Sequence, residues 1–293
     1  MTEGSNINSG GRNERVADLL LNRLLPNEQI MKVGPFVSLG HVYPILFQKQ
    51  EPEPYRGQHA HPNRGMVTLS YVLSGSLQHI DSHHNRGVIN SGGLLWRKAG
   101  NGIIHDERPS TGFLREGGLL HIVKFWINLP GINKEETPEC RALAAADIPE
   151  LELPDNAGVL KVLLGSCGVL QSRLKTFLNE FIYHIRLNPK SSFSYPAKQD
   201  LEYAAFVPAD DIRINDLVMG NSHLLVFSRD EASIQLYNPG ISITDVFVFG
   251  GQEYLEPIVI GGPFVMNSRN EVAQAYGDFF AGRYGELSFD HPL

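Results

Sequence analysis

The chain has 293 residues, of which 42% are hydrophobic and 19% charged, a composition typical of globular proteins with one large or two smaller domains. Its formal net charge of -7 argues against a polyanion-binding surface, so we expect no direct nucleic-acid binding. No run reaches the roughly 18 apolar residues of a membrane span, and two distant cysteines without a basic-then-apolar leader favour a cytoplasmic protein.

Residues 1–30 are expected to form an N-terminal extension. Residues 1–12 are small and polar, which predicts a disordered tail. The segment from Asn13 to Leu25 is predicted to be a helix, because its apolar residues recur at helical spacing: Val16, Leu19, Leu20 and Leu24. A helix this short is marginal alone, so we expect it to dock on the body or on a second subunit.

Short strands broken by turn residues are predicted from residue 31 to residue 145. The turn signals recur at about the 8 to 12 residue spacing that is typical of sandwiches and barrels. The expected strands are Phe36–Leu39, Met66–Leu73, Leu77–Asp81, Arg86–Ile89, Leu94–Arg97, Ile103–Glu107 and Leu119–Leu129.

A second β unit is predicted for residues 146–293. The proline- and acid-rich stretch from Pro130 to Pro154 is interpreted as the connection between the halves, and further strand-like runs follow it. Near the C-terminus, Ser268 and Glu271 have the spacing of a capping box that begins a helix with one apolar face. Gly282 is the expected end of that helix.

Two clusters of metal-ligand side chains lie about forty residues apart in the first half. His59, His61 and Asn63 alternate in one cluster, and His105 and Glu107 alternate in the other. Side chains two apart in a strand share a face, so each cluster can direct its members to one side. Imidazole with carboxylate is a donor set suited to Fe, Mn, Ni, Cu or Zn.

Several ordered motifs resemble those of the pirin family of the cupin superfamily. The resemblance covers about residues 31 to 285. It rests on His61–Gly65 (HPNRG), Thr68–Gly75, His79–Asp81, Asn85–Gly87, Ala99–Glu107, Phe125–Pro130, Glu256–Pro257 and Gly262–Asn267.

The resemblance implies two antiparallel cupin barrels in one all-β chain, with a single metal, usually iron, in the N-terminal barrel. The four ligands of the family, three histidines and one glutamate, fall on His61, Asn63, His105 and Glu107. Asn63 thus stands where the family has a histidine. Three arrangements follow: Asn63 binds weakly, His59 takes the fourth position, or three protein ligands hold the metal. A site that has lost its metal is a further alternative.

Three functional hypotheses follow from this resemblance. The first is a metal-dependent dioxygenase of the quercetin 2,3-dioxygenase type, with Fe(II) the expected metal and a small flavonoid-like substrate. Glu107 would then accept the substrate hydroxyl proton. The second class is a regulatory module that binds a protein partner, such as a transcription factor or a metabolic enzyme. A structural double barrel with a decayed site is the third hypothesis.

The remaining histidines of the first half are expected to play lesser roles. His121 alternates with Val123, Phe125 and Ile127, so it is expected either to face the barrel interior and line the pocket or to be a satisfied core histidine. His79 and the two histidines after Asp81 flank a polar turn and are expected to be solvated.

Overall fold

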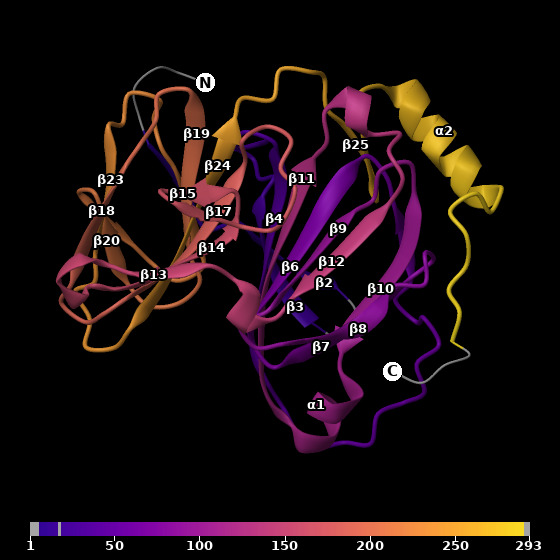
Figure 1. Cartoon of the computed structure of the whole chain (residues 1–293), viewed down its shortest axis with the longest axis horizontal. Helices are drawn as coiled ribbons and strands as arrows, with labels where there is room; N and C mark the ends of the chain where they lie inside the picture. The colour runs from indigo at the N-terminus through magenta and orange to yellow at the C-terminus, as the bar shows by residue number, and fades with distance from the viewer. Residues whose placement is uncertain (1–5, 17–18, 290–293) are drawn as a thin grey trace. The chain divides into compact units, whose positions relative to one another are not determined.

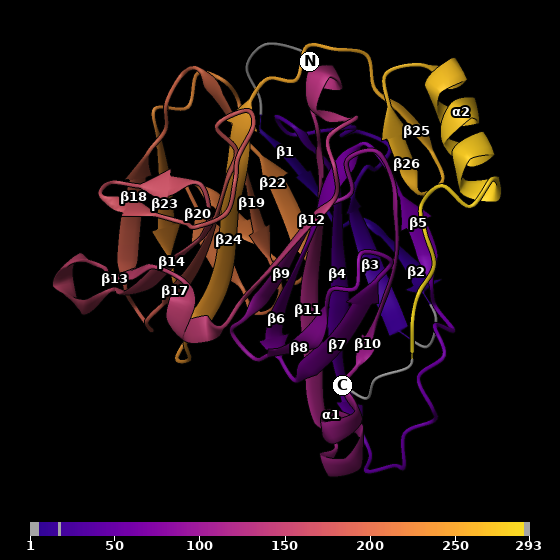
Figure 2. The same ribbon diagram turned by 45° about the vertical axis from the view of Figure 1, so that its right-hand side comes forward.

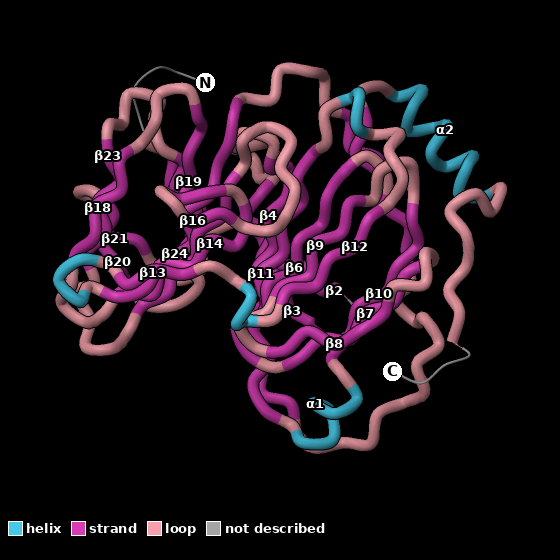
Figure 3. The backbone as a smooth tube through the Cα atoms, in the orientation of Figure 1, coloured by secondary structure: helices cyan, strands magenta, loops and turns pink. Residues whose placement is uncertain are grey.

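The computed structural model describes residues 6–16 and 19–289, which form two compact units built mainly from antiparallel strands (Figures 1 and 3). The expected all-β, two-barrel fold is confirmed. The first-barrel unit comprises residues 15–20, 42–147 and 255–293, and the second-barrel unit comprises residues 1–14, 21–41 and 148–254. In the described part of the chain, the helices are α1 (Thr111–Glu116), α2 (Arg269–Phe280) and the 3-10 turns η1 (Gly131–Asn133), η2 (Ala145–Asp147) and η3 (Pro154–Asn156).

The candidate ligands lie in the first barrel, on a four-stranded sheet with the order β5-β10-β7-β8. A seven-stranded sheet has the order β12-β9-β6-β11-β4-β3-β2, and its strands β3 and β4 run through residues of both units. The bounds are β2 (Arg12–Val16), β3 (Leu19–Leu25), β4 (Phe36–Phe47), β5 (His61–Asn63), β6 (Met66–Ser74), β7 (Ser76–Asp81), β8 (Arg86–Asn90), β9 (Leu94–Lys98), β10 (Ile103–Pro109), β11 (Gly118–Asn128) and β12 (Glu139–Leu143).

The second-barrel unit has a seven-stranded sheet, β1-β22-β19-β24-β17-β14-β13, and a four-stranded sheet, β18-β23-β20-β21 (Figure 2). Both sheets contribute side chains to one apolar core, which includes the fully buried Leu160, Ile185 and Ile234. The bounds are β1 (Ile7–Ser9), β13 (Glu150–Glu152), β14 (Gly158–Leu164), β15 (Ser166–Cys167), β16 (Leu170–Gln171), β17 (Phe181–Leu187), β18 (Ser192–Pro196), β19 (Leu201–Val207), β20 (Ile212–Ile214), β21 (Leu217–Met219), β22 (His223–Val226), β23 (Ser233–Tyr237) and β24 (Thr244–Gln252).

The helix predicted from Asn13 to Leu25 is wrong, because this segment forms strands β2 and β3. The predicted apolar face would have buried Val16 and Leu20, yet each is 49% exposed. Sheet pairing instead buries Leu24 and Leu25 completely. The disordered tail predicted for residues 1–12 is wrong where β1 pairs with β22; residues 1–5 lie outside the described part.

The C-terminal segment returns to the first-barrel unit, where α2 lies beside a hairpin of β25 (Val259–Gly261) and β26 (Phe264–Met266) (Figure 2). The predicted capping box is confirmed, since Ser268 accepts from the backbone N–H of Glu271 and Glu271 caps Ser268 in return. The described residues 255–289, expected with the second barrel, are grouped with the compact unit of the first.

Candidate functional site

Strands β5 and β10 bring the two predicted ligand clusters together. They pair antiparallel, with His61 opposite His105 and Asn63 opposite Ile103. His105 and Glu107 share a face of β10 because they are two residues apart. The imidazole rings of His61 and His105 approach to 4.3 Å between centroids.

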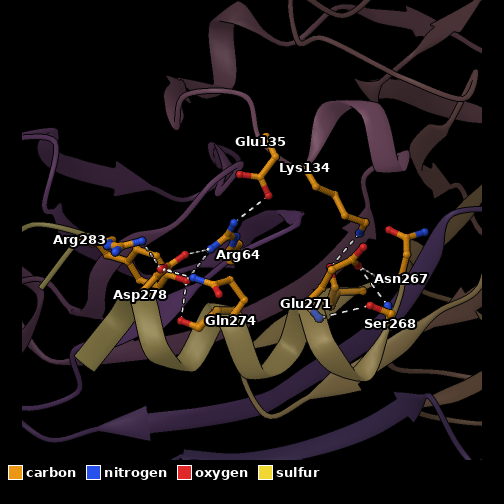
Figure 4. Close-up of polar contacts among 12 residues, drawn as sticks. Arg64, Lys134, Glu135, Asn267, Ser268, Glu271, Gln274, Asp278 and Arg283 are labelled. Atoms are coloured by element: carbon orange, nitrogen blue, oxygen red, sulfur yellow. Dashed lines mark hydrogen bonds and ion pairs between the residues drawn. The ribbon is translucent and has the colours of Figure 1, made fainter. Parts of the chain in front are cut away.

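Strand β5 is held in place by the residue that follows it. The guanidinium of Arg64 is buried and donates to Asp278 on α2 at 2.6 Å and to Glu135 at 2.7 Å (Figure 4). Gly65 adopts φ +79°, and a Cβ there would collide with the carbonyl oxygen of Val265 in β26. The Arg64–Gly65 pair of the HPNRG motif thus fixes the turn between β5 and β6 against the C-terminal hairpin.

The His61 ring is oriented by the backbone of His59. Its Nδ1 lies 2.9 Å from the carbonyl oxygen of His59, which can only accept, so Nδ1 carries the proton. The Nε2 lone pair of neutral His61 is left for another partner. His59 itself is exposed and contributes to the site through this carbonyl.

Asn63 is buried against His105. Its amide is best satisfied when Nδ2 donates to the carbonyl oxygens of Pro263 at 3.0 Å and Pro62 at 3.3 Å. Oδ1 of Asn63 then accepts from Nε2 of His105. The Asn63 amide is therefore hydrogen-bonded to Nε2 of His105, the ring nitrogen through which this histidine would bind a metal.

Arg97 on β9 reaches the opposite nitrogen of the His105 ring. Its Nη1 donates to Nδ1 of His105 at 2.9 Å and to Oε1 of Glu107 at 2.8 Å. A guanidinium has donors only, so Nδ1 must accept and the proton of neutral His105 sits on Nε2. Burial and the Arg97 charge hold the pKa of His105 well below its usual range.

Both carboxylate oxygens of Glu107 are already engaged. Oε1 accepts from Arg97, while Oε2 accepts from Nζ of Lys124 at 2.9 Å and from the hydroxyl of Ser70 at 2.8 Å. Burial alone would raise the pKa of Glu107, but Lys124 and Arg97 lower it well below its usual value. Arg97 Nε also lies 3.7 Å from a carboxylate oxygen of the buried Asp81. Two cations thus face two carboxylates.

The comparisons with known proteins identify the family. The Pirin family model matches residues 18–127, and that of the Pirin C-terminal cupin domain matches residues 182–285. A Pseudomonas aeruginosa protein provisionally named quercetin 2,3-dioxygenase is 32% identical over 252 residues, covering 86% of this chain and 87% of the relative. The chain belongs to the pirin family. A pirin-like protein of Arabidopsis thaliana is also 32% identical, over 77% of this chain and 74% of the relative.

Solved structures show the same bicupin fold. One described as quercetin 2,3-dioxygenase from Acinetobacter baumannii has a TM-score of 0.88 at 26% identity, covering 98% of this chain and 99% of that chain. A bacterial pirin from Escherichia coli, solved in complex with nickel(II), has a TM-score of 0.66 at 17% identity, covering 85% of this chain and 100% of the other. At that identity the likeness concerns the fold alone. No helix in the described part of the chain is long and apolar enough to cross a membrane.

The metal implied by the pirin family does not fit the side chains present here. A histidine binds a metal through a deprotonated nitrogen, but Arg97 forces the proton of His105 onto the Nε2 that faces Asn63. Glu107 is shared between two cations. Within residues 6–16 and 19–289, no three His, Cys, Asp or Glu side chains are arranged to hold a metal ion.

Arg97, Lys124 and Ser70 were missed by the sequence reasoning. Lys124 faces Glu107, so the residues that alternate with it on β11, Val123, Phe125 and Ile127, face away from the candidate site. His121, expected either to line the pocket or to be a core histidine, is buried, and its role stays a prediction. The available signal was a charged residue within an apolar strand: Lys124 in Gly118–Asn128 and Arg97 in Leu94–Lys98. His79, expected to be solvated, is buried opposite Glu107.

Proposed function

We propose that this member of the pirin family is a regulatory module that binds a protein partner. Its first barrel would work without a resident metal. The hydrogen bond from Arg97 to Nδ1 of His105 carries the proposal, because it selects the ring tautomer that cannot ligate through Nε2. Asn63 supports it, since a neutral amide is a weaker donor than imidazole for a borderline cation.

Charge balance supports the same conclusion. The positive charges of Arg97 and Lys124 offset the negative charges of Glu107 and Asp81 in the barrel interior. A divalent ion would add two uncompensated charges to this neutral cluster. Arg97 is 1% exposed, so solvent would screen that repulsion poorly.

Metal content tests the proposal directly. We expect purified wild-type protein, incubated with Fe(II) or Ni(II) and then desalted, to retain well below one metal per chain by elemental analysis. A variant with both Arg97→Met and Asn63→His frees Nδ1 of His105 and restores the third imidazole, so its metal content should rise toward one per chain. Asn63→His alone is the matched control and should gain little while Arg97 remains.

A metal bound to the wild-type protein would contradict the proposal. If wild-type protein holds about one metal per chain and His105→Ala loses it, His105 ligates despite Arg97 and the metal-free proposal fails. Circular dichroism of each variant shows whether a low metal content reflects unfolding rather than a missing ligand.

The second candidate function is a metal-dependent dioxygenase of the quercetin 2,3-dioxygenase type. The His61 ring favours it, since a Nδ1–H bonded to a backbone carbonyl with a free Nε2 is the usual arrangement of a metal-bound histidine. His61, His105 and Glu107 would hold the metal, Fe(II) first among Ni, Mn, Cu and Zn, with Asn63 or His59 in the fourth position. Before His105 could bind a metal through Nε2, its hydrogen bond from Arg97 would have to break.

The electrostatics of Glu107 disfavour its expected role in that reaction. A general base is most effective when its pKa lies near the working pH, whereas Lys124 and Arg97 hold the pKa of Glu107 well below its usual value. Oxygen uptake with quercetin, measured after incubation with Fe(II), separates the two functions. Turnover that disappears in His105→Ala would favour the dioxygenase, and a rate equal to the protein-free blank would favour the binding module.

A further inference from the structure

A cavity of about 500 Å³ lies against the face of the four-stranded sheet that is opposite to the candidate ligands. Arg108 on β10 and Gln78 on β7 line it and are paired across the two strands. Because side chains alternate along β10, Arg108 points away from the face that carries Glu107. Tyr55 from the segment before β5 and Phe289 from the chain after α2 also line the cavity.

Two donors in this cavity have no acceptor. Gln78 is 1% exposed, and its Oε1 accepts from the backbone N–H of Thr111 at 3.1 Å, but its buried Nε2 has no partner among the described residues. Nε of Arg108 is likewise buried and unpaired within that part of the chain, although Nη2 donates to the carbonyl oxygen of Glu53. Buried donors left unpaired are costly, so a ligand that supplies acceptors would be stabilised here.

The ionised side chains of the lining favour a negative ligand. Three arginines, Arg86, Arg108 and Arg115, face the cavity with a single carboxylate, Glu53. Arg115 is exposed and paired at 2.9 Å with Glu51, so Arg108, whose Nε has no acceptor in the described part of the chain, is the cation that we assign to the ligand. A planar carboxylate matches the geometry of guanidinium and amide donors.

The remaining lining is flat and apolar. Tyr55 and Phe289 meet edge to face with centroids 5.7 Å apart, and the guanidinium of Arg108 stacks 4.2 Å from the Tyr55 ring centre. Ile80 on β7 adds an aliphatic surface. Aromatic walls beside paired donors suit a ring that carries an acid group.

We propose that this cavity binds a small aromatic carboxylate, with its oxygens on Gln78 Nε2 and Arg108 Nε and its ring against the apolar wall formed by Ile80, Tyr55 and Phe289. This site goes beyond the proposed function of the barrel interior, since it shares none of the residues His61, Asn63, His105 and Glu107.

Calorimetric titration with benzoate, in buffer that contains a chelator, tests the site independently of any metal in the barrel. We expect saturable binding to the full-length protein, weakened by about 10-fold or more in Arg108→Met and in Gln78→Met, because each removes a hydrogen bond to a charged group. Arg141→Met is the matched control, since Arg141 is an exposed arginine of β12 in the same unit, and its affinity should equal that of the wild type.

Two further ligands test the contributions of the charge and of the aromatic ring separately. Inorganic phosphate supplies charge without a ring and benzyl alcohol supplies a ring without charge, so each should bind more weakly than benzoate. Phe289→Ala should weaken benzoate while leaving phosphate unchanged. The proposal is overturned if benzoate does not bind, if it binds folded Arg108→Met and Gln78→Met as tightly as wild type, or if phosphate binds as well as benzoate.

Discussion

Arg97 and His105 are joined by a hydrogen bond of 2.9 Å in which the guanidinium donates to Nδ1 of the imidazole. The same Nη1 also reaches Glu107, so one buried cation sets both the tautomer of the histidine and the charge partner of the carboxylate. Arg97, Lys124, Glu107 and Asp81 thus form an ion-pair network around the His105 ring.

Replacement of Arg97 by methionine should destabilise the first barrel. The change leaves Glu107 with Lys124 alone and Asp81 without its cation, so we expect a loss of about 3–5 kcal/mol in the free energy of unfolding, the usual cost of breaking a buried pair. Chemical denaturation followed by circular dichroism measures it. Arg141→Met should cost less than about 1 kcal/mol, because that ion pair is exposed. Equal losses in the two variants would contradict the network.

Part of the site and of the fold could be predicted from the sequence. The convergence of His61, Asn63 and His105 was predictable, because strand alternation and the HPNRG motif do not depend on distant contacts. The tautomer of His105 was not, since it depends on Arg97 of another strand. The segment of Leu19–Leu25 has apolar spacing that suits either a helix or a strand, and pairing in the sheet decided between them.

Removal of Asp278 should loosen the C-terminal helix from the first barrel. Asp278 accepts from the buried Arg64 at 2.6 Å and also from Gln274 and Arg283 (Figure 4). Asp278→Ala should lower the free energy of unfolding by about 2–3 kcal/mol, the loss typical of hydrogen bonds to charged groups. Glu135→Ala removes the other carboxylate bonded to Arg64, but its side chain is 65% exposed, so we expect less than about 1 kcal/mol. The reverse order would show that α2 is not anchored through Asp278.

Acid should weaken the same contact. The hydrogen bond from Arg64 holds the pKa of Asp278 below its ordinary value of 3.8. Above 3.8 the carboxylate is ionised in the folded and the unfolded chain, so its full contribution to stability is present. As the pH falls through the lowered folded-state value, the carboxylate is protonated and that contribution is lost.

Melting temperatures measured from neutral to acidic pH test whether the contribution of Asp278 to stability is lost as the pH falls. The difference between wild type and Asp278→Asn should be largest near neutral pH and should shrink below about pH 4, because the wild type also loses its ion pair there. A difference that stays constant with pH would mean that ionised Asp278 contributes nothing to the contact.

Asn22 on β3 should be the polar anchor of the N-terminal strands in the second-barrel unit. It is 1% exposed, and its Nδ2 donates to the carbonyl oxygen of Gly10 at 2.8 Å and to the hydroxyl of Ser222 at 2.8 Å. Ser222 precedes β22, the strand that pairs with β1. Nδ2 also donates to the carbonyl oxygen of Ser222 at 3.1 Å, so a leucine at position 22 keeps the approximate volume of the side chain but leaves three acceptors without this donor.

We therefore expect Asn22→Leu to lower the free energy of unfolding by about 1–3 kcal/mol, the cost of buried polar groups without a partner. Hydrogen exchange of the β1 and β22 amides should rise in the same variant, because their pairing depends on the position of Gly10 and Ser222. Asn8→Ala is the matched control: its contact with His223 is exposed, so it should change neither stability nor exchange at β22 beyond about 0.5 kcal/mol. Unchanged exchange in Asn22→Leu would show that β1 is held by its strand pairing alone.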